Sequence, residues 1–480
     1  MKHDYRSLFI GGEWVPAADA EVNTVIAAST EEPMGRTPLG GAKDIDAAVA
    51  AARRAFDGTG WSDLAPGERA DALERFATAL EARAQRIAET VTGEIGMPIS
   101  LSKQVNGSFG PAVLRYYAGL ARTLPLTEDR VAFRGGTTQV RREPVGVVGA
   151  IVAWNYPQPL AMMKIAPALA AGCTIVLKPA LETALDANIV ADAAAEAGLP
   201  PGVFNVVPGG LEAGEALVAH PGVNKVAFTG STPAGRSIGE VCGRLLRPVT
   251  LELGGKSAAV ILDDADLEAT VAGLARVSFP NSGQTCYAST RVLAPVSRYE
   301  EVLDAVTTMA ASLPMGDPFD PATALGPVVS ARQRERVEHY IALGRDAGAR
   351  LTTGGGRPKH LNRGWYVEPT VFGDVRNDMT IAQEEIFGPV VVVIPYRDEE
   401  EAVTLANDSE YGLGGSVWTS DIDRGTALAG RIQTGTVGIN GYTLDFASPF
   451  GGYKASGLGR ELGPEGLHAY FQLKSVYLPT

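Results

Sequence analysis

A cysteine and a glutamate in glycine-rich surroundings are the residues of this sequence best suited to covalent chemistry. Cys286 ends the segment 281–286 (NSGQTC), and Glu252 lies in the segment 249–257 (VTLELGGKS). A thiolate can attack an electrophilic carbon, and it needs a base to accept a proton or to activate the water that later releases a covalent intermediate. Taken singly, a cysteine is more often a small buried side chain and a glutamate a solvated one. The neighbouring glycines, which let a backbone approach a ligand closely, weaken both of these simpler interpretations.

Three further segments could bind a dinucleotide, because each follows a predicted strand. Lys178 follows the run 174–177, a Gly-Gly pair at 209–210 follows another apolar run, and the segment 228–235 (FTGSTPAG) leads from a strand into a helix. Dinucleotides bind at such strand ends in doubly wound sheets, and backbone N–H groups at a helix start bind pyrophosphate. The GxxxxG spacing of the last segment is weak by itself, since a plain turn has the same composition. Together the three segments predict a cofactor site.

Alternating strands and helices would position these residues. Apolar runs and helical periodicity alternate from Val145 to Phe228 and again from about residue 258 to 450. This alternation predicts an α/β fold with doubly wound, mostly parallel sheets. We expect a strand meander over 5–40, a helix from Asp44, one helix from Pro66 to about Gly93 and another over 107–122. The later expected strands are 145–154, 174–177, 203–207, 225–228, 258–262, 290–296, 390–396, 415–418 and 435–439, and the later helices are 159–171, 185–197, 214–220, 265–277, 299–312, 331–344, 398–407 and 421–431.

The segment 130–143 differs from the rest of the chain. Two β-rich runs flank Gly135-Gly136, which predicts a hairpin, and both of its faces are polar. Such a hairpin is either an exposed flap or an element that pairs with another subunit. The run 471–478 is a second strand-like segment at the end of the chain.

Composition narrows the class of protein. Apolar residues make up 45% and charged residues 20% of the 480, which fits a soluble globular protein of two or three domains. The net charge of −13 argues against nucleic acid or an anionic membrane as a partner. The odd number of cysteines, 3, without a CxxC pair, predicts no disulfide framework and a cytoplasmic location. The five scattered histidines give no support to a metal site. Residues 144–163 carry no charge, but interrupting glycines and prolines favour a buried strand, a turn and a helix over a membrane span.

The segments 251–256 (LELGGK) and 283–286 (GQTC) resemble the two signature segments of the NAD(P)-dependent aldehyde dehydrogenase superfamily, in the hydrolytic, non-acylating type. The resemblance covers nearly the whole chain. It implies a cofactor-binding domain at 1–121 and 145–253 and a catalytic domain at 254–455. In that family the hairpin and the C-terminal strand form an oligomerisation element, here 122–144 and 456–480, which implies a homo-oligomer, a dimer or a homotetramer.

The resemblance also implies the roles of individual residues. Cys286 would attack the aldehyde carbon, Asn155 would donate a hydrogen bond to the oxyanion, Glu252 would activate the hydrolytic water, and Lys164 would support the site. The implied cofactor-binding residues are Val152, Trp154, Lys178, Gly210, Gly214, Gly230, Ser231, Leu253, Glu385 and Phe387. The implied substrate-tunnel residues are Met163, Tyr287, Leu444, Phe446 and Phe450, which predict an apolar medium-chain or aromatic aldehyde.

One position departs from the family pattern. Relatives that prefer NAD commonly carry glutamate three residues after the lysine, where it bonds the adenosine ribose, and this chain has Leu181 there. Leucine neither bonds a 2′-hydroxyl nor repels a 2′-phosphate, so NAD and NADP both remain open. Glu182 is adjacent and is a substitute if its side chain faces the cofactor.

Three other functions compete with hydrolytic aldehyde oxidation. Relatives that pass the acyl group to coenzyme A typically lack the glutamate, so Glu252 argues against an acylating semialdehyde dehydrogenase. A cysteine hydrolase would need a histidine beside Cys286, and none of the five stands in an evident motif. A non-catalytic member of the fold would not need Cys286, Glu252 and Asn155 together, so their joint presence argues against that role.

Overall fold

Eight strands form the first of two large sheets in the computed structural model, which describes residues 3–58 and 60–479. Its order is β22-β12-β11-β8-β9-β10-β2-β3, and the five strands from β12 to β10 are parallel. The parallel strands are β8 (Val147–Ile151), β9 (Thr174–Lys178), β10 (Phe204–Val206), β11 (Lys225–Thr229) and β12 (Val249–Glu252), and the antiparallel ones are β2 (Leu8–Ile10), β3 (Glu13–Val15) and β22 (Gly457–Leu458).

Helices cover both faces of this sheet, because successive residues of each strand point to opposite sides. Val148 and Ile175 pack with one group of helices, whereas Val147 and Val176 pack with the other. The first group contains α2 (Pro66–Glu81), α3 (Ala84–Ile95), α5 (Phe109–Thr123), α6 (Pro157–Ala171) and α7 (Ala184–Glu196); the second contains α1 (Ala42–Gly58), α8 (Leu211–Ala219) and α9 (Thr232–Arg244). A short helix α4 (Ile99–Ser102) and a π-helical turn η1 (Lys103–Gly107) join α3 to α5.

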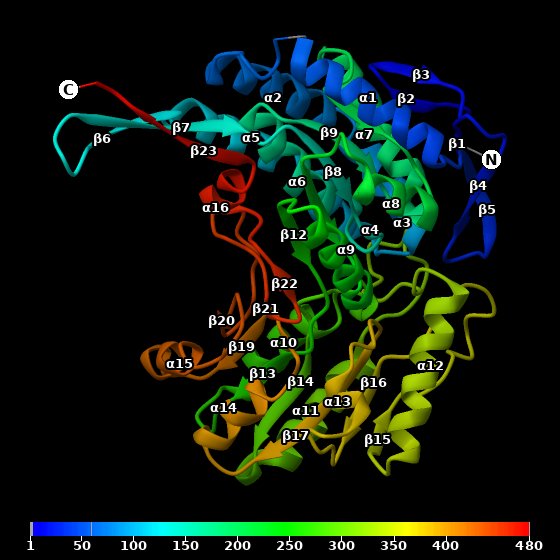
Figure 1. Ribbon diagram of the computed structural model, residues 1–480. Coiled ribbons are helices and arrows are strands. Elements are labelled where there is room, and N and C mark those ends of the chain that lie inside the picture. Colours follow the sequence, from blue (N-terminus) through cyan, green and yellow to red (C-terminus); the bar gives the residue numbers. More distant parts are fainter. Residues whose placement is uncertain (1–2, 59, 480) are drawn as a thin grey trace.

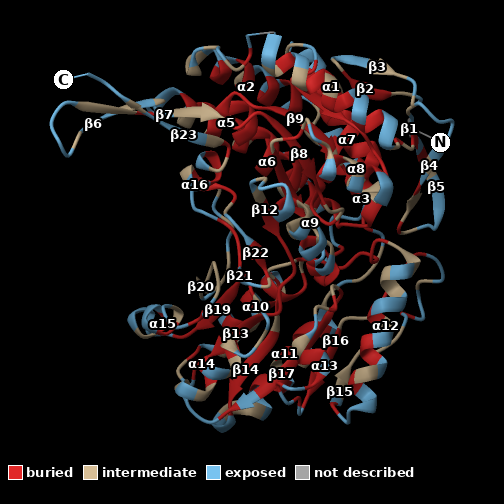
Figure 2. Cartoon of the chain, viewed as in Figure 1, coloured by how far each residue is buried: buried red, intermediate tan, exposed pale blue. Residues whose placement is uncertain are grey.

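The second sheet has seven strands in the order β15-β16-β17-β14-β13-β19-β20, and all but β15 run parallel. These are β13 (Ser257–Ile261), β14 (Ser289–Pro295), β15 (Arg350–Thr353), β16 (Thr370–Gly373), β17 (Val390–Tyr396), β19 (Gly415–Trp418) and β20 (Gly438–Ile439). The flanking helices are α10 (Leu267–Ser278), α11 (Tyr299–Ser312), α12 (Ala331–Asp346), α13 (Thr380–Gln383), α14 (Glu399–Asn407) and α15 (Ile422–Ala429). The two sheets lie one above the other in Figure 1, and Figure 2 shows that the central strands of both are buried. The expected α/β architecture with two doubly wound sheets is therefore confirmed.

A three-stranded arm projects from this body, at the left of Figure 1. It contains the predicted hairpin, β6 (Thr127–Val131) and β7 (Thr137–Pro144), and the C-terminal strand β23 (Phe471–Tyr477), which pairs antiparallel with β7. A helix α16 (Gly463–His468) leads into β23. The predicted hairpin and its pairing with the C-terminal strand are confirmed.

One prediction about the helices is wrong. The helix expected from Pro66 to Gly93 is two helices, because the chain turns at Ala82 and Arg83 and only α2 packs on α5, while α3 packs against η1 and α7. Apolar spacing hid this break, since Leu80 and Ile87 are seven residues apart and keep the phase of two helical turns.

The remaining strands belong to small sheets. β4 (Val22–Ala27) and β5 (Glu32–Pro38) pair antiparallel, β1 (His3–Asp4) pairs parallel with β5, and β18 (Tyr411–Gly412) pairs with β21 (Tyr453–Lys454). The single meander expected over 5–40 is wrong, because β2 and β3 from this stretch join the first sheet. Across residues 3–58 and 60–479, no helix is long and apolar enough to cross a membrane, and the segment 144–163 is the buried strand, turn and helix that the sequence indicates. The division into domains at 121, 145, 253 and 455 stays a prediction; β22, from the predicted tail, lies in the first sheet.

Candidate active site

The predicted site residues meet where the carboxyl edge of the first sheet faces the amino edge of the second. Glu252, Lys178 and Thr229 end strands of the first sheet, while Cys286 precedes β14 and Glu385 precedes β17. A cavity of about 2030 Å³ occupies this junction. Cys286, Asn155 and all the predicted cofactor-binding residues line it.

Two glycines lie close to other parts of the site, and Gly255 brings the two signature segments into contact. A Cβ on Gly255 would lie 2.4 Å from the carbonyl oxygen of Cys286, and one on Gly254 would lie 2.6 Å from Oε2 of Glu385. Gly255 has no room for a side chain, because its Cβ would meet backbone, whereas a Cβ on Gly254 would meet the end of the Glu385 side chain. Gly255 therefore sets the distance between the nucleophile segment and the end of β12.

The turn before Cys286 is strained and heavily hydrogen-bonded. Asn281 and Ser282 have φ of 51° and 55°, which non-glycine residues rarely adopt. Ser282 donates to the carbonyl of Gly326, and Gln284 Oε1 accepts from the N–H of Val329. Burial, and then the carboxylates of Glu385 and Glu252, raise the pKa of the Cys286 thiol above its ordinary value. The thiol must therefore lose its proton before Sγ can attack.

Glu252 is buried at the end of β12 and is not among the residues that line the cavity. Neither of its carboxylate oxygens accepts a hydrogen bond from any residue that the structure describes. Burial, and then the neighbouring carboxylate of Glu461, raise its pKa well above the ordinary value, while Lys164 and Arg460 oppose this shift. An unpaired buried carboxylate costs stability and gains reactivity toward a proton.

Lys164 lies behind the cavity rather than on its wall. Its fully buried Nζ lies 2.8 Å from Oε1 of Glu461 and donates to the hydroxyl of Thr229 at 2.6 Å. No sequence pattern predicts this role for Glu461 or Thr229, because Glu461 lies in an irregular part of the tail. The pair places one ammonium and one more carboxylate beside Glu252.

The side-chain amide of Asn155 has one N–H group that no described residue accepts. Its Nδ2 donates to the carbonyl of Gln284 at 3.1 Å, and an amide carries two N–H groups, so one is left unused by the described residues. The first bond fixes the orientation of the amide on the wall of the cavity that also holds Cys286.

The cofactor side of the cavity combines a lysine, a carboxylate and two aromatic rings. Lys178 Nζ donates to the carbonyls of Pro179 and Gly209, and burial lowers its pKa to about 8. Glu385 Oε1 accepts from the N–H of Gly255, and burial raises its pKa to about 7. The rings of Trp154 and Phe387 lie edge to face with centroids 5.4 Å apart.

The glycine-rich turns predicted for pyrophosphate lie at helix starts. Gly210 immediately precedes α8, and Ser231 immediately precedes α9. Sequence reasoning missed Gln333 and Arg336 of α12, which also line the cavity and donate to the carbonyls of Phe387 and Glu385, respectively. On an amphipathic helix such polar residues are indistinguishable from a solvated face.

The far end of the cavity is mainly apolar. Met163, Tyr287, Leu444 and Phe450 line it as predicted for the tunnel, whereas Phe446 packs against Phe109 and Tyr116 outside this lining. Residues that sequence reasoning missed are Leu101, Val105, Phe109, Tyr156, Leu160 and Tyr442. The rings of Tyr287 and Tyr442 are stacked, with centroids 4.6 Å apart. Arg276 lies on the rim, exposed.

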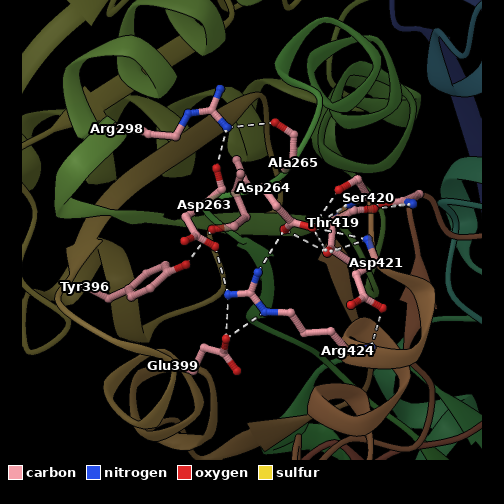
Figure 3. Close-up of polar contacts among 12 residues, drawn as sticks. Asp263, Asp264, Ala265, Arg298, Tyr396, Glu399, Thr419, Ser420, Asp421 and Arg424 are labelled. Atoms are coloured by element: carbon pink, nitrogen blue, oxygen red, sulfur yellow. Dashed lines mark hydrogen bonds and ion pairs between the residues drawn. The ribbon is translucent and has the colours of Figure 1, made fainter.

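The carboxyl edge of the second sheet, where a parallel sheet also offers a ligand site, is filled by its own side chains (Figure 3). Arg424 forms ion pairs with Asp263 at 2.8 Å, Asp264 at 3.2 Å and Glu399 at 2.5 Å. Asp264 also accepts hydrogen bonds from the hydroxyls of Thr419 and Ser420. Among the described residues, no group of three or more histidine, cysteine, aspartate or glutamate side chains has a geometry that could hold a metal ion.

Comparisons with known proteins agree with this geometry. The protein-family model of the aldehyde dehydrogenase family matches residues 14–476. A geranial dehydrogenase from Castellaniella defragrans is 54% identical over 478 residues, covering 100% of both chains. An aldehyde dehydrogenase of Mycobacterium tuberculosis complexed with NAD+ superposes with a TM-score of 0.98 at 50% identity, covering 100% of this chain and 99% of that one. A mutant of aldehyde dehydrogenase C from Pseudomonas syringae, complexed with NAD+ and octanal, gives 0.95 at 38% identity, covering 98% and 96%.

Proposed function

Because this chain belongs to the aldehyde dehydrogenase family, we propose that it oxidises an apolar aldehyde to the free carboxylic acid through a thioester on Cys286. One observation carries the proposal. A single cavity is lined by the glycine turns at helix starts, by Cys286 and Asn155, and by an apolar wall, so cofactor, nucleophile and substrate share one space.

The cofactor side fits a nicotinamide dinucleotide, and NAD fits better than NADP. Lys178 keeps one N–H unused by the described residues, the starts of α8 and α9 offer backbone N–H groups, and Glu385 offers a carboxylate to a ribose. Glu182 lines the same cavity, and its charge raises the pKa of Lys178, so it would repel a 2′-phosphate. The bound nucleotide supplies the hydride acceptor. The Mycobacterium tuberculosis relative, which is complexed with NAD+, supports this assignment.

Acylation uses Cys286 and Asn155. After the thiol has released its proton to water, Sγ attacks the aldehyde carbon and the carbonyl electron pair moves to oxygen. The spare N–H of Asn155 and the backbone N–H of Cys286 stabilise this oxyanion, and loss of one such donor typically costs about 3 kcal/mol of barrier. Departure of the hydride leaves a thioester on Cys286.

Deacylation uses Glu252. Its unpaired carboxylate takes a proton from water, the resulting hydroxide attacks the thioester, and the thiolate leaves. The Lys164–Glu461 pair lies close enough to influence the charge of Glu252. A base in this position favours hydrolysis over transfer to coenzyme A, and its presence together with Cys286 disfavours a non-catalytic role.

The substrate class follows from the apolar wall. Met163, Tyr287, Leu444 and Phe450 offer no charge for a distal carboxylate or phosphate, and they suit a medium-chain, terpenoid or aromatic aldehyde. The geranial dehydrogenase relative and the octanal complex of another relative support this class. The exposed Arg276 on the rim lies in solvent and does not replace the missing charge inside.

The arm supports a homo-oligomer. Val131 is 94% exposed, Phe133 at the hairpin tip is fully exposed, and Tyr477 of β23 is 81% exposed. Large apolar side chains on a projecting arm are typical of a subunit contact. We propose a tetramer, which light scattering coupled to gel filtration measures directly.

A reducing compartment suits the cysteines. Cys173, Cys242 and Cys286 are free thiols, and burial raises the pKa of Cys173 to about 11, which keeps it inert. We place the enzyme in the cytoplasm.

Purified protein with NAD+ or NADP+ and an aldehyde, without coenzyme A, tests the function through the absorbance of the reduced nucleotide. We expect turnover with octanal, geranial and benzaldehyde, a preference for NAD+, and no turnover in Cys286→Ala. A higher kcat/KM for succinate semialdehyde would overturn the substrate class, and turnover that requires coenzyme A would overturn hydrolysis.

A further inference from the structure

Tyr156, at the entrance to α6, makes a polar contact beside the nucleophile. Its hydroxyl lies 2.8 Å from Oγ1 of Thr285, the residue immediately before Cys286. The side chain is buried and its ring lines the cavity. The contact crosses from the first sheet's β8–α6 loop to the segment that precedes β14.

The direction of this hydrogen bond is determined by counting protons. Thr285 Oγ1 donates to the carbonyl of Pro280 at 3.1 Å, and a hydroxyl has one proton to give. Tyr156 is therefore the donor to Thr285. Burial raises the pKa of Tyr156 well above its ordinary value, so the phenol keeps this proton throughout the working pH range.

The hydrogen bond from Tyr156 to Thr285 is one of three contacts between the β8–α6 loop and the segment that precedes β14. Asn155 donates to the carbonyl of Gln284, Asn281 Nδ2 donates to the carbonyl of Asn155 at 2.9 Å, and Tyr156 donates to Thr285. The tethered turn contains the left-handed residues Asn281 and Ser282. Such a turn persists only when its surroundings hold it, and these bonds hold it from the β8–α6 loop of the first sheet.

We propose that Tyr156 is a positioning residue, whose hydroxyl holds Thr285 and thereby places the Sγ and the backbone N–H of Cys286 for attack and for oxyanion stabilisation. The proposal rests on the proposed role of Cys286. A phenylalanine would form the same apolar wall, so the hydroxyl has no purpose in packing. A buried hydroxyl without a partner is unfavourable, and its single acceptor lies next to the nucleophile.

The test is Tyr156→Phe, which removes one oxygen atom and keeps the ring. We expect the single-turnover burst of reduced nucleotide to slow about tenfold, because small displacements of reacting groups cost rate steeply. The rate of alkylation of Cys286 by iodoacetamide should change as well, while KM for NAD+ stays unchanged. A merely structural residue would lower the melting temperature without altering these rates per folded active site.

Tyr396→Phe is the matched control, because Tyr396 also donates from a buried hydroxyl, to the carbonyl of Ile261 at 2.7 Å, and lies at the distant edge of the second sheet. It should lose stability and keep its burst rate. Thr285→Val should match Tyr156→Phe, and Thr285→Ser should restore the burst. The double variant should be no slower than either single one.

The outcomes separate two failures. If the unmodified enzyme gives no burst, or if Cys286→Ala gives one, the role of Cys286 itself is overturned. A normal burst in the unmodified enzyme that is unchanged in both Tyr156→Phe and Thr285→Val would overturn the positioning role alone. If Tyr156→Phe does not fold, the comparison of Thr285→Val with Thr285→Ser decides the matter.

Discussion

The carboxyl edges of the two parallel sheets have the same topology and opposite contents. At the first edge, which we call the open edge, β9, β11 and β12 end in Lys178, Thr229 and Glu252, beside a cavity of about 2030 Å³. At the second edge, which we call the closed edge, Arg424 and Asp264 fill the corresponding place with ion pairs and hydrogen bonds (Figure 3). In the proposed mechanism the second sheet contributes through its amino edge instead, where Cys286 precedes β14.

The difference lies in how far the polar groups are satisfied. Asp264 accepts from hydroxyls, backbone N–H groups and a guanidinium, whereas the carboxylate of Glu252 accepts from none of the described residues. A satisfied polar cluster stabilises the fold, and an unsatisfied one keeps its reactivity at a cost in stability. This contrast makes opposite predictions for substitutions at the two edges.

The largest expected effect is on turnover at the open edge. Glu252→Gln should lower the steady-state rate by about 10²–10⁴-fold, since a general base is lost, while the first burst of reduced nucleotide remains. Because the pKa of Glu252 is raised, the rate of the unmodified enzyme should increase as pH rises through that pKa. This limb should be absent from the pH profile of Glu252→Gln. Steady-state turnover equal to that of the unmodified enzyme would remove Glu252 from deacylation.

At the closed edge the expected effect is on stability. Asp264→Ala should lower the free energy of unfolding by about 3 kcal/mol, because several donors, one of them charged, lose their acceptor. Thermal denaturation measures the loss, and KM for both substrates should stay unchanged. Asp378→Ala, at an exposed ion pair, is the control and should change the free energy of unfolding by no more than about 0.5 kcal/mol. A change of KM in Asp264→Ala would contradict the assignment of this edge to structure.

Specificity for the nucleotide should change by a smaller amount. Leu181→Glu adds a carboxylate to the cavity wall, beside Glu182. The ratio of kcat/KM for NAD+ over NADP+ should rise about tenfold, equivalent to about 1.4 kcal/mol, through a hydrogen bond to ribose and repulsion of a 2′-phosphate. Leu181→Gln, which lacks the charge, should raise this ratio only by the part that is due to hydrogen bonding. An unchanged ratio would place the adenosine ribose elsewhere.

The smallest effect is a gain in stability at the open edge. A raised carboxyl pKa contributes stability that is fully present below the ordinary pKa of the unfolded chain and is lost as pH rises through the pKa of the folded protein. Glu252→Gln removes the buried charge, so near pH 8 it should be more stable than the unmodified enzyme by about 1 kcal/mol. Below about pH 4 the difference should disappear. Parallel curves of melting temperature against pH would contradict this reasoning.

The sequence predicted most of the fold because its patterns are local. Alternating apolar runs identified β8, β9, β11 and the strands around β13 and β14, and the Gly135-Gly136 pair identified the hairpin. The break between α2 and α3 escaped prediction, because the apolar periodicity continues across it. Periodicity indicates which side of a helix is apolar, and it does not reveal a turn that preserves the phase of the apolar repeat.

The site was predictable only where a motif marks it. Cys286 and Glu252 stand in glycine-rich segments, and the geometry brings them to the same junction. Glu461 and Thr285 acquire their contacts from tertiary packing, over distances in sequence that no local pattern encodes. The family resemblance assigned Phe446 to the tunnel, but its ring packs against Phe109 and Tyr116 and it is not among the residues that line the cavity.

The thioester on Cys286 is tested by the mass of the peptide that contains Cys286, after Glu252→Gln has reacted with octanal and NAD+. We expect one acyl adduct, with the mass of the aldehyde less two hydrogens, on Cys286 and not on Cys173 or Cys242. The adduct should form in step with the burst of reduced nucleotide and persist because its hydrolysis has lost its base. Reduced nucleotide without an adduct on Cys286, or an adduct on another cysteine, would rule out the proposed role of Cys286.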